Sequence, residues 1–148
     1  MGTASPFRII RAHSTEHMAQ VRAIRQQVFI DEQGIPAELE WDGMDEAALH
    51  LLALDPEQRP IGVARLLPSG QIGRMAVVAL WRRRGVGSAL LLRLQAEAAT
   101  GGYPELFLHA QLSALPFYVR LGFQPQGEIF EEAGIPHRLM TGPHISPT

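Results

Sequence analysis

Three strand-like segments follow one another closely in the middle of the chain, and they constrain the fold more than any other feature. They span residues 50–54, 61–67 and 71–78, and each of the first two ends at a turn that contains proline. Such short connections are typical of antiparallel hairpins. The sequence therefore predicts an antiparallel meander as part of the sheet.

A helix over residues 85–99 follows the third strand. Its apolar residues recur at helical spacing and would form one buried face, and Gly101-Gly102 ends it. The residues of that face are Val86, Leu90, Leu91 and Leu94.

The flanking segments alternate between strands and helices. We expect a strand at 7–11, a helix from Ser14 or Thr15 to about residue 33, an acidic loop or broken helix at 38–46, a strand at 106–108, a helix capped by Ser113 and closed by Gly122, and final strands within 123–140. This order predicts an α/β fold with a mixed sheet in a single domain, residues 1–148.

The composition excludes several classes of protein. With 46% hydrophobic and 19% charged residues the chain has enough apolar residues for a core, and its net charge of −2 is unlike that of a nucleic-acid binder. The absence of cysteine excludes disulfides, thiolate metal sites and a cysteine nucleophile. No histidine and carboxylate spacing indicates a metal site, and no serine-hydrolase elbow is present. Residues 1–11 lack the apolar region of a signal peptide. No apolar run in the sequence approaches the ~20 residues that a membrane span needs. We therefore expect a cytoplasmic protein without membrane partners.

The densest chemical signal is the segment 82–88, Arg-Arg-Arg-Gly-Val-Gly-Ser, between a strand and a helix. A helix N-terminus has free N–H groups that bind anions, and glycine lets a phosphate approach the backbone. The segment could instead be a turn with solvated arginines, part of a dinucleotide-binding fold, or a patch that binds nucleic acid. The third glycine and the parallel βαβ unit of a dinucleotide fold are absent, and no aromatic residues are interleaved with the arginines.

Two motifs together resemble the GNAT acetyltransferase superfamily. The first is Arg-Met-Ala-Val-Val at 74–78 followed by Arg-Arg-Gly-Val-Gly at 83–87, and the second is Tyr-Val-Arg-Leu-Gly-Phe at 118–123. The N-terminal half and the segment Ala-Gly-Ile-Pro-His at 133–137 are similar to the ElaA-like branch. The resemblance covers nearly the whole chain and implies a mostly antiparallel central sheet flanked by helices.

The resemblance also implies acetyl-CoA as cosubstrate and no metal. The strand before the loop would splay from its neighbour and pair with the pantetheine arm, and one of its N–H groups would hold the thioester carbonyl. The loop backbone would bind the pyrophosphate, and Gln111 stands where the family often has a pantetheine-binding asparagine. The cofactor-binding residues implied are Met75, Ala76, Val77, Arg83, Arg84, Gly85, Val86, Gly87, Ser88 and Gln111.

The resemblance implies that Tyr118 is the tyrosine that protonates the leaving thiolate. The alternative is that Tyr118 is a core residue with a satisfied hydroxyl. The base stays open. His109 is one candidate, since an imidazole titrates near neutral pH, although a lone histidine in an apolar strand is often a core residue. Glu40 is another, as a base or, with Glu32, as a binding group for a cationic acceptor; the alternative is a solvated acidic loop.

The sequence therefore predicts an acetyl-CoA-dependent N-acetyltransferase in which a primary amine attacks directly in a ternary complex. The alternative is a non-catalytic CoA-binding or regulatory module of the same fold. The acetyl acceptor could be a small-molecule amine or a peptide N-terminus. We do not expect nucleic acid as a partner, and the chain could form a homodimer.

Overall fold

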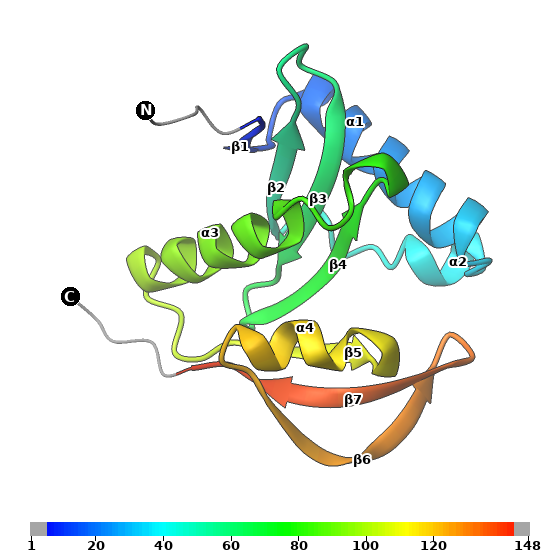
Figure 1. The fold of residues 1–148 in the computed structure, drawn as a ribbon, viewed down its shortest axis with the longest axis vertical. Helices are drawn as coiled ribbons and strands as arrows, with labels where there is room; N and C mark the ends of the chain where they lie inside the picture. Colours follow the sequence, from blue (N-terminus) through cyan, green and yellow to red (C-terminus); the bar gives the residue numbers. More distant parts are fainter. Residues whose placement is uncertain (1–5, 144–148) are drawn as a thin grey trace.

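The computed structural model describes residues 6–143, which form one seven-stranded sheet in the order β1-β2-β3-β4-β5-β7-β6 (Figure 1). Only the β4–β5 pair is parallel, and the other pairs are antiparallel. The strands are β1 (Arg8–Arg11), β2 (Leu49–Leu54), β3 (Pro60–Leu66), β4 (Gln71–Val77), β5 (Phe107–Gln111), β6 (Gln124–Glu132) and β7 (Ile135–Thr141).

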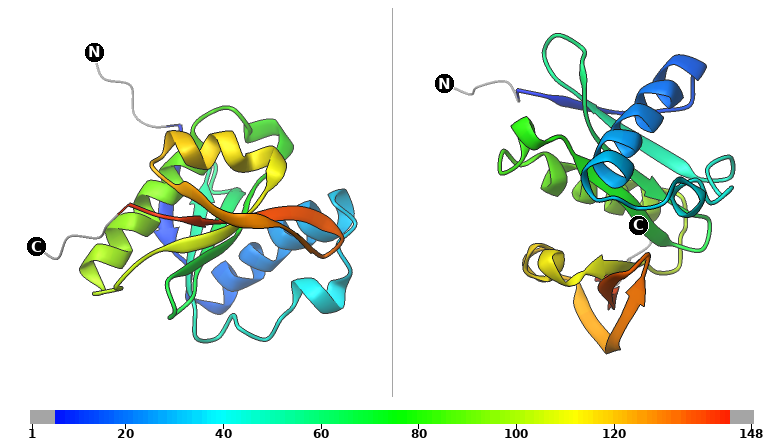
Figure 2. Two further views of the ribbon diagram at one scale, coloured as in Figure 1. Left: turned by 90° about the horizontal axis from the view of Figure 1, so that it is seen from below. Right: turned by 90° about the vertical axis from the view of Figure 1, so that its right-hand side faces the viewer.

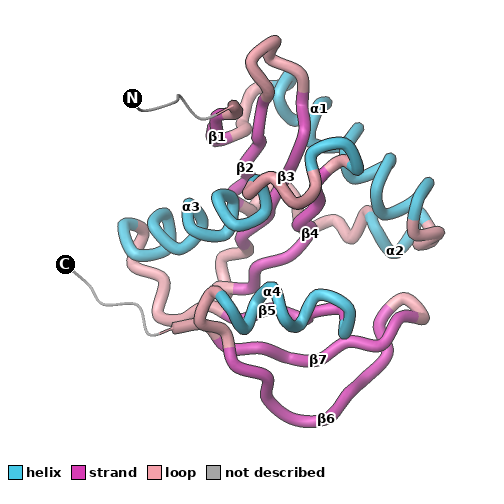
Figure 3. Tube along the Cα trace, viewed as in Figure 1, coloured by secondary structure: helices cyan, strands magenta, loops and turns pink. Residues whose placement is uncertain are grey.

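Helices cover both faces of the sheet, as Figure 3 shows by colour. They are α1 (Thr15–Arg25), which continues as the π-helix η1 (Gln26–Glu32), α2 (Ala37–Glu40), α3 (Val86–Thr100) and α4 (Leu115–Arg120), with short 3₁₀ turns η2 (Ala79–Trp81) and η3 (Leu112–Ala114). The right-hand view of Figure 2 separates α1 from α3, which lie on opposite faces of β2–β4.

Side chains of β2 point alternately to the two faces of the sheet, and this explains why each face packs against a hydrophobic core. Leu51 and Ala53 pack with the buried stripe of α3, whereas Leu52 and Leu54 pack with the stripe of α1. Successive side chains of a strand point to opposite faces, so a central strand covered on both sides is apolar throughout. Gly62 lets α3 approach closely, because a Cβ there would lie 3.0 Å from Val86 and 3.2 Å from Leu90.

A bulge in β4 accompanies the divergence of the sheet. Val63 pairs with Ala76 and Arg65 with Gly73, so two residues of β4 oppose the single residue between them on β3. One of the two, Arg74, has a φ of 49°, in the left-handed region. The parallel pairing of β4 with β5 is limited to Gln71 with Phe107 and Ile72 with Leu108. Beyond those pairs the two strands diverge, as Figure 1 shows.

The predicted fold class, the mostly antiparallel mixed sheet and the buried face of α3 are confirmed. Ser14 caps α1, accepting a hydrogen bond from the His17 N–H at 3.0 Å. The predicted cap at Ser113 is wrong, because a 3₁₀ turn at 112–114 precedes α4 and the residue at its N-cap is Ala114. No helix within residues 6–143 combines the length and apolar character needed to cross a bilayer.

Candidate active site

A cleft of about 500 Å³ opens where β4 and β5 diverge. One wall consists of β4, α2 and the loop after α2, and the other consists of β5 and the β6–β7 hairpin. Of the predicted site residues, the cleft is lined by Met75, Tyr118, Gln111, His109 and Glu40. Within residues 6–143 no group of three potential metal ligands gathers.

Tyr118 lies on α4 beside the end of the β4 bulge. Burial raises the pKa of its phenol to about 12, so the hydroxyl keeps its proton at neutral pH. The hydroxyl lies 3.7 Å from Met75 Sδ, the one hydrogen-bond acceptor it has among the described residues. A thioether is a weak acceptor, and a buried tyrosine hydroxyl ordinarily finds a stronger one. The proton is therefore available to a ligand atom in the cleft.

The N-terminus of α3 follows the predicted phosphate loop. Gly85 is its N-cap, with a φ of 84°, and no side chain caps the first turn. Its N–H groups at Val86, Gly87 and Ser88 therefore lack helical partners, as the first turn of any helix does. A Cβ at Gly87 would lie 3.4 Å from the Phe117 ring of α4, which is ordinary van der Waals contact.

The three arginines before this helix have different surroundings. Arg82 donates from Nη1 and Nη2 to the two carboxylate oxygens of Glu32, both at 2.8 Å, and from Nε to the Val77 carbonyl at 2.8 Å. It thus ties the loop to η1 and to the end of β4. Arg83 is exposed, and the Arg84 guanidinium lies 5.0 Å from the centroid of the Trp81 ring. Glu32, a predicted acceptor-binding group, is a partner of the loop instead.

Gln111, at the end of β5, reaches across the cleft. Its Nε2 donates to Oε1 of Gln33 at 3.0 Å, so the amide joins β5 to the segment after η1. Gln111 therefore lines the cleft with its side-chain amide already engaged, and the contact with pantetheine stays a prediction.

His109 carries a polar cluster on the β5 wall. Its Nδ1 lies 3.0 Å from Glu132 Oε1, and the other oxygen of Glu132 lies 3.8 Å from His137 Nε2. Because an ionised carboxylate only accepts, Nδ1 is the donor, and Nε2 keeps its lone pair in the neutral ring. Phe130 packs edge-on against His109, with ring centroids 5.1 Å apart. This arrangement orients an imidazole that lines the cleft.

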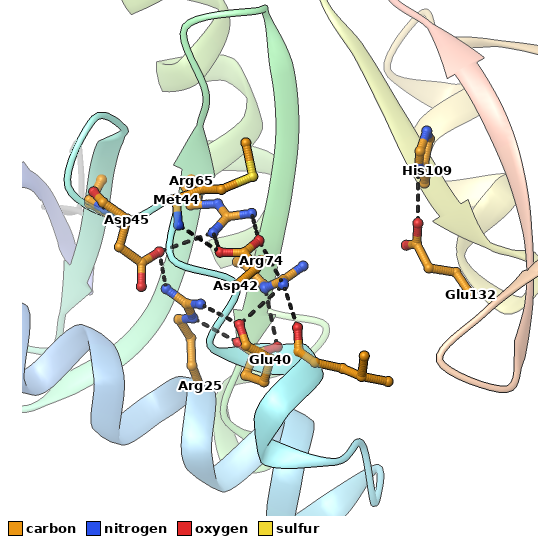
Figure 4. A network of polar contacts seen from close by, with 11 residues as sticks. Arg25, Glu40, Asp42, Met44, Asp45, Arg65, Arg74, His109 and Glu132 are labelled. Carbon is orange, nitrogen blue, oxygen red and sulfur yellow. Dashed lines mark hydrogen bonds and ion pairs between the residues drawn. The ribbon is translucent and has the colours of Figure 1, made fainter.

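The acidic stretch forms a closed ring of ion pairs with three arginines from distant elements. The charges alternate around the ring with N–O distances of 2.7 to 3.1 Å, in the order Arg25, Glu40, Arg74, Asp42, Arg65, Asp45 and back to Arg25. Figure 4 shows this ring on one side of the view and the His109–Glu132 pair on the other. Three positive and three negative charges make the ring neutral.

The ring contradicts the role predicted for Glu40. Its carboxylate is 2% exposed and is paired with both Arg25 and Arg74, so it is neither accessible to an acceptor nor free to bind a cation. Burial is the largest influence on its pKa and raises it, although the hydrogen bond from Arg25 opposes the shift. At Asp42 burial acts in the same direction, but the hydrogen bonds from Arg65 and the Met44 N–H outweigh it and lower the pKa to about 2.

Comparison with known proteins decides the family. The acetyltransferase (GNAT) domain family matches residues 12–142 of the chain. This chain belongs to that family. It is 34% identical over 138 residues to the protein called uncharacterized N-acetyltransferase YjcF of Bacillus subtilis, over 90% of this chain and 98% of YjcF.

Solved structures agree with this assignment. A structure described as a proposed N-acetyltransferase from Lactobacillus plantarum matches with a TM-score of 0.87 and 28% identity, covering 95% of this chain and 99% of that one. Escherichia coli ElaA matches with a TM-score of 0.79 and 29% identity, covering 93% and 99%. The chain is thus an acyl-CoA-dependent N-acetyltransferase of the ElaA-like branch of the GNAT superfamily.

Sequence reasoning missed Glu132 and the arginines of the ring. Glu132 follows His109 by 23 positions, and the pairing of β5, β7 and β6 brings the two together. A motif does not reveal such a contact, although the strand order of the family fold would have placed the two strands near each other.

Proposed function

We propose that this GNAT protein transfers an acetyl group from acetyl-CoA directly to the nitrogen of a primary amine, with both substrates bound together. The divergence of β4 from β5 carries the proposal. Beyond Ile72, β4 has no ladder pairing with β5 among the described residues, and Gly73, Arg74 and Met75 line the cleft there. A pantetheine arm carries amide groups, and Met75, Ala76 and Val77 would pair with it as with an added strand.

The phosphate groups of the donor would lie at the N-terminus of α3. The free N–H groups of the first turn and the helix dipole favour an anion there. Arg83 and Arg84 would add positive charge, and the backbone from Arg83 to Ser88 would form the binding loop. Arg82 would hold the loop in place through Glu32 rather than meet the phosphate.

Tyr118 is the acid of the proposed reaction. As the amine nitrogen bonds to the thioester carbonyl carbon, the carbon–sulfur bond breaks and negative charge develops on sulfur. The Tyr118 hydroxyl, which has only a weak protein acceptor, then donates its hydrogen bond and its proton to the departing thiolate. The burial that raises its pKa keeps that proton in place until the thiolate charge develops.

His109 is the base, and Glu132 is its positioning residue. An amine that attacks must lose a proton, and His109 Nε2 can take it because Glu132 holds the other ring nitrogen as a donor. The imidazolium that forms lies beside a carboxylate, which stabilises it. This pairing favours His109 over Glu40 as the base.

The reaction is tested by mixing the protein with acetyl-CoA and a panel of primary amines. We expect free CoA and an N-acetylated amine in equal amounts, and initial-velocity lines that intersect when both substrates are varied. Parallel lines would contradict direct attack in a ternary complex. CoA binding without release of CoA by any amine would instead identify a non-catalytic CoA-binding module.

The base assignment is tested by Glu132→Gln, with Glu131→Gln as the control on the opposite face of β6. Removing the carboxylate should lower kcat about ten-fold or more and leave the KM for acetyl-CoA unchanged. Glu131→Gln should change neither of these. Equal effects of the two substitutions would exclude the positioning role.

A further inference from the structure

Among residues 6–143, the α2 wall of the cleft has no carboxylate that is unpaired and could bind a cation. Each acidic group of the ion-pair ring contacts two guanidinium groups, and of the three only Glu40 and Asp42 line the cleft. Arg65 and Arg74 line it beside them. An ammonium placed against this wall would lose water without gaining an unpaired negative charge, which is costly.

The same wall presents apolar side chains. Leu39 and Met44 line the cleft and are 49% and 48% exposed, although both are large and hydrophobic. Phe29 and Ile35 line the cleft with them. Apolar side chains that remain accessible inside a concave site mark a surface for an apolar ligand group.

The ion-pair ring holds both exposed residues by their backbones. Arg74 Nη2 donates to the Leu39 carbonyl at 3.2 Å, and the Met44 N–H donates to Asp42 Oδ1 at 3.1 Å. Figure 4 shows Met44 next to Asp42 and Arg65 in the ring. A backbone fixed in this way presents its side chains in a preset arrangement, which lowers the entropy lost on binding.

The opposite wall has a carboxylate that is paired with histidine rather than with arginine. Glu132 is 49% exposed and lies beside His137 and beside His109, the proposed base. The lining of the cleft is therefore polar at one wall and apolar, with neutralised charges, at the other. A ligand that matches it has one amine and an apolar body.

We infer that the acceptor is a monoamine with an aliphatic or aromatic body, whose amine meets His109 and whose body lies against Leu39 and Met44. This inference rests on the proposed acetyl transfer to a primary amine. Polyamines fit poorly, because their distal ammonium would meet the neutral ring and the apolar side chains. The ring selects against them by having its carboxylates already paired.

The test compares hexylamine with hexamethylenediamine, which has the same carbon chain and a second amine. We expect kcat/KM for hexylamine to exceed that for the diamine by about ten-fold or more, although the diamine has two equivalent reactive ends. Phenethylamine should be accepted as hexylamine is. An equal or better rate with the diamine, or a strong preference for the N-terminus of trialanine, would overturn the inference.

Variants of the wall provide the second measurement. Leu39→Ser and Met44→Ser should each lower kcat/KM for hexylamine about five- to ten-fold, with little change for ethylamine and none in the KM for acetyl-CoA. Leu92→Ser, at an exposed leucine of α3 outside the cleft, is the matched control. Unchanged hexylamine kinetics in both wall variants would refute the assigned surface. Failure of every amine to release CoA would refute the proposed reaction itself, which separates the two failures.

Discussion

The Tyr118→Phe substitution isolates one hydroxyl in the cleft and tests the chemistry assigned to it. The ring packs between Phe117 and Phe123, with centroids 5.0 and 6.0 Å away, and phenylalanine preserves that packing. The hydroxyl gives up only its contact with Met75 Sδ at 3.7 Å. The free energy of unfolding should therefore change by less than about 1 kcal/mol.

The effect on the reaction follows from the burial of the site. Burial raises the pKa of Tyr118 to about 12. A thiolate formed beside this hydroxyl would also lack water, so we expect the hydroxyl to stabilise it. A hydrogen bond to a charged group contributes about 1.5–3 kcal/mol. Because each 1.36 kcal/mol corresponds to a factor of ten in rate, we expect the chemical step to slow by about 100-fold.

Single-turnover rapid quench at saturating acetyl-CoA measures that step apart from product release, and calorimetry measures CoA binding. CoA affinity should change little, because the thiolate charge exists only as the bond breaks. Tyr103→Phe is the matched control, since Tyr103 packs beyond the C-terminal end of α3. If the single-turnover rate of Tyr118→Phe equals that of the wild type, the acid role is wrong and Tyr118 is a packing residue.

Three further predictions concern the loop and the ion-pair ring. Replacing Arg83 and Arg84 together by alanine should raise the calorimetric Kd for CoA about ten-fold, and an unchanged Kd would mean that these arginines do not meet the phosphates. Glu40→Gln should lower the free energy of unfolding in urea by about 3 kcal/mol, because buried guanidinium groups lose a charged partner. The control Glu38→Gln, at an exposed residue of the same helix, should lower it by less than about 0.5 kcal/mol. Equal losses would show that the ring does not stabilise the fold. The pKa of Asp42 is lowered from 3.8 to about 2, so the stability that its carboxylate contributes is complete above its unfolded pKa and is lost as the pH falls from 4 toward 2. Acid unfolding of Asp42→Asn should lack that part of the pH dependence. If Asp42→Asn and the wild type show the same pH dependence, Asp42 does not stabilise the fold in this way.

Local patterns in the sequence predicted the elements that depend on local chemistry. The short turns predicted the β2–β4 meander, helical spacing predicted the buried face of α3, and Gly85 was expected where the helix begins. The two motifs placed Tyr118 in the cleft together with Met75. Each of these inferences uses residues that are close in the sequence or that stand in a recurring motif.

The charge arrangement of the site could not be predicted in that way. The acidic residues from Glu38 to Glu46 suggested a surface for a cationic acceptor, but arginines of α1, β3 and β4 neutralise three of them. Pairing of that kind depends on tertiary contacts between distant segments. The same holds for Glu132, which reaches His109 only because the β6–β7 hairpin lies beside β5.

The structure of the protein in complex with CoA tests the central claim most directly. We predict that the pantetheine arm lies between β4 and β5, paired with the backbone of Met75–Val77, with the pyrophosphate at the N-terminus of α3 and the sulfur within hydrogen-bonding distance of the Tyr118 hydroxyl. CoA bound elsewhere on the protein, or a sulfur remote from Tyr118, would contradict the site and the mechanism together.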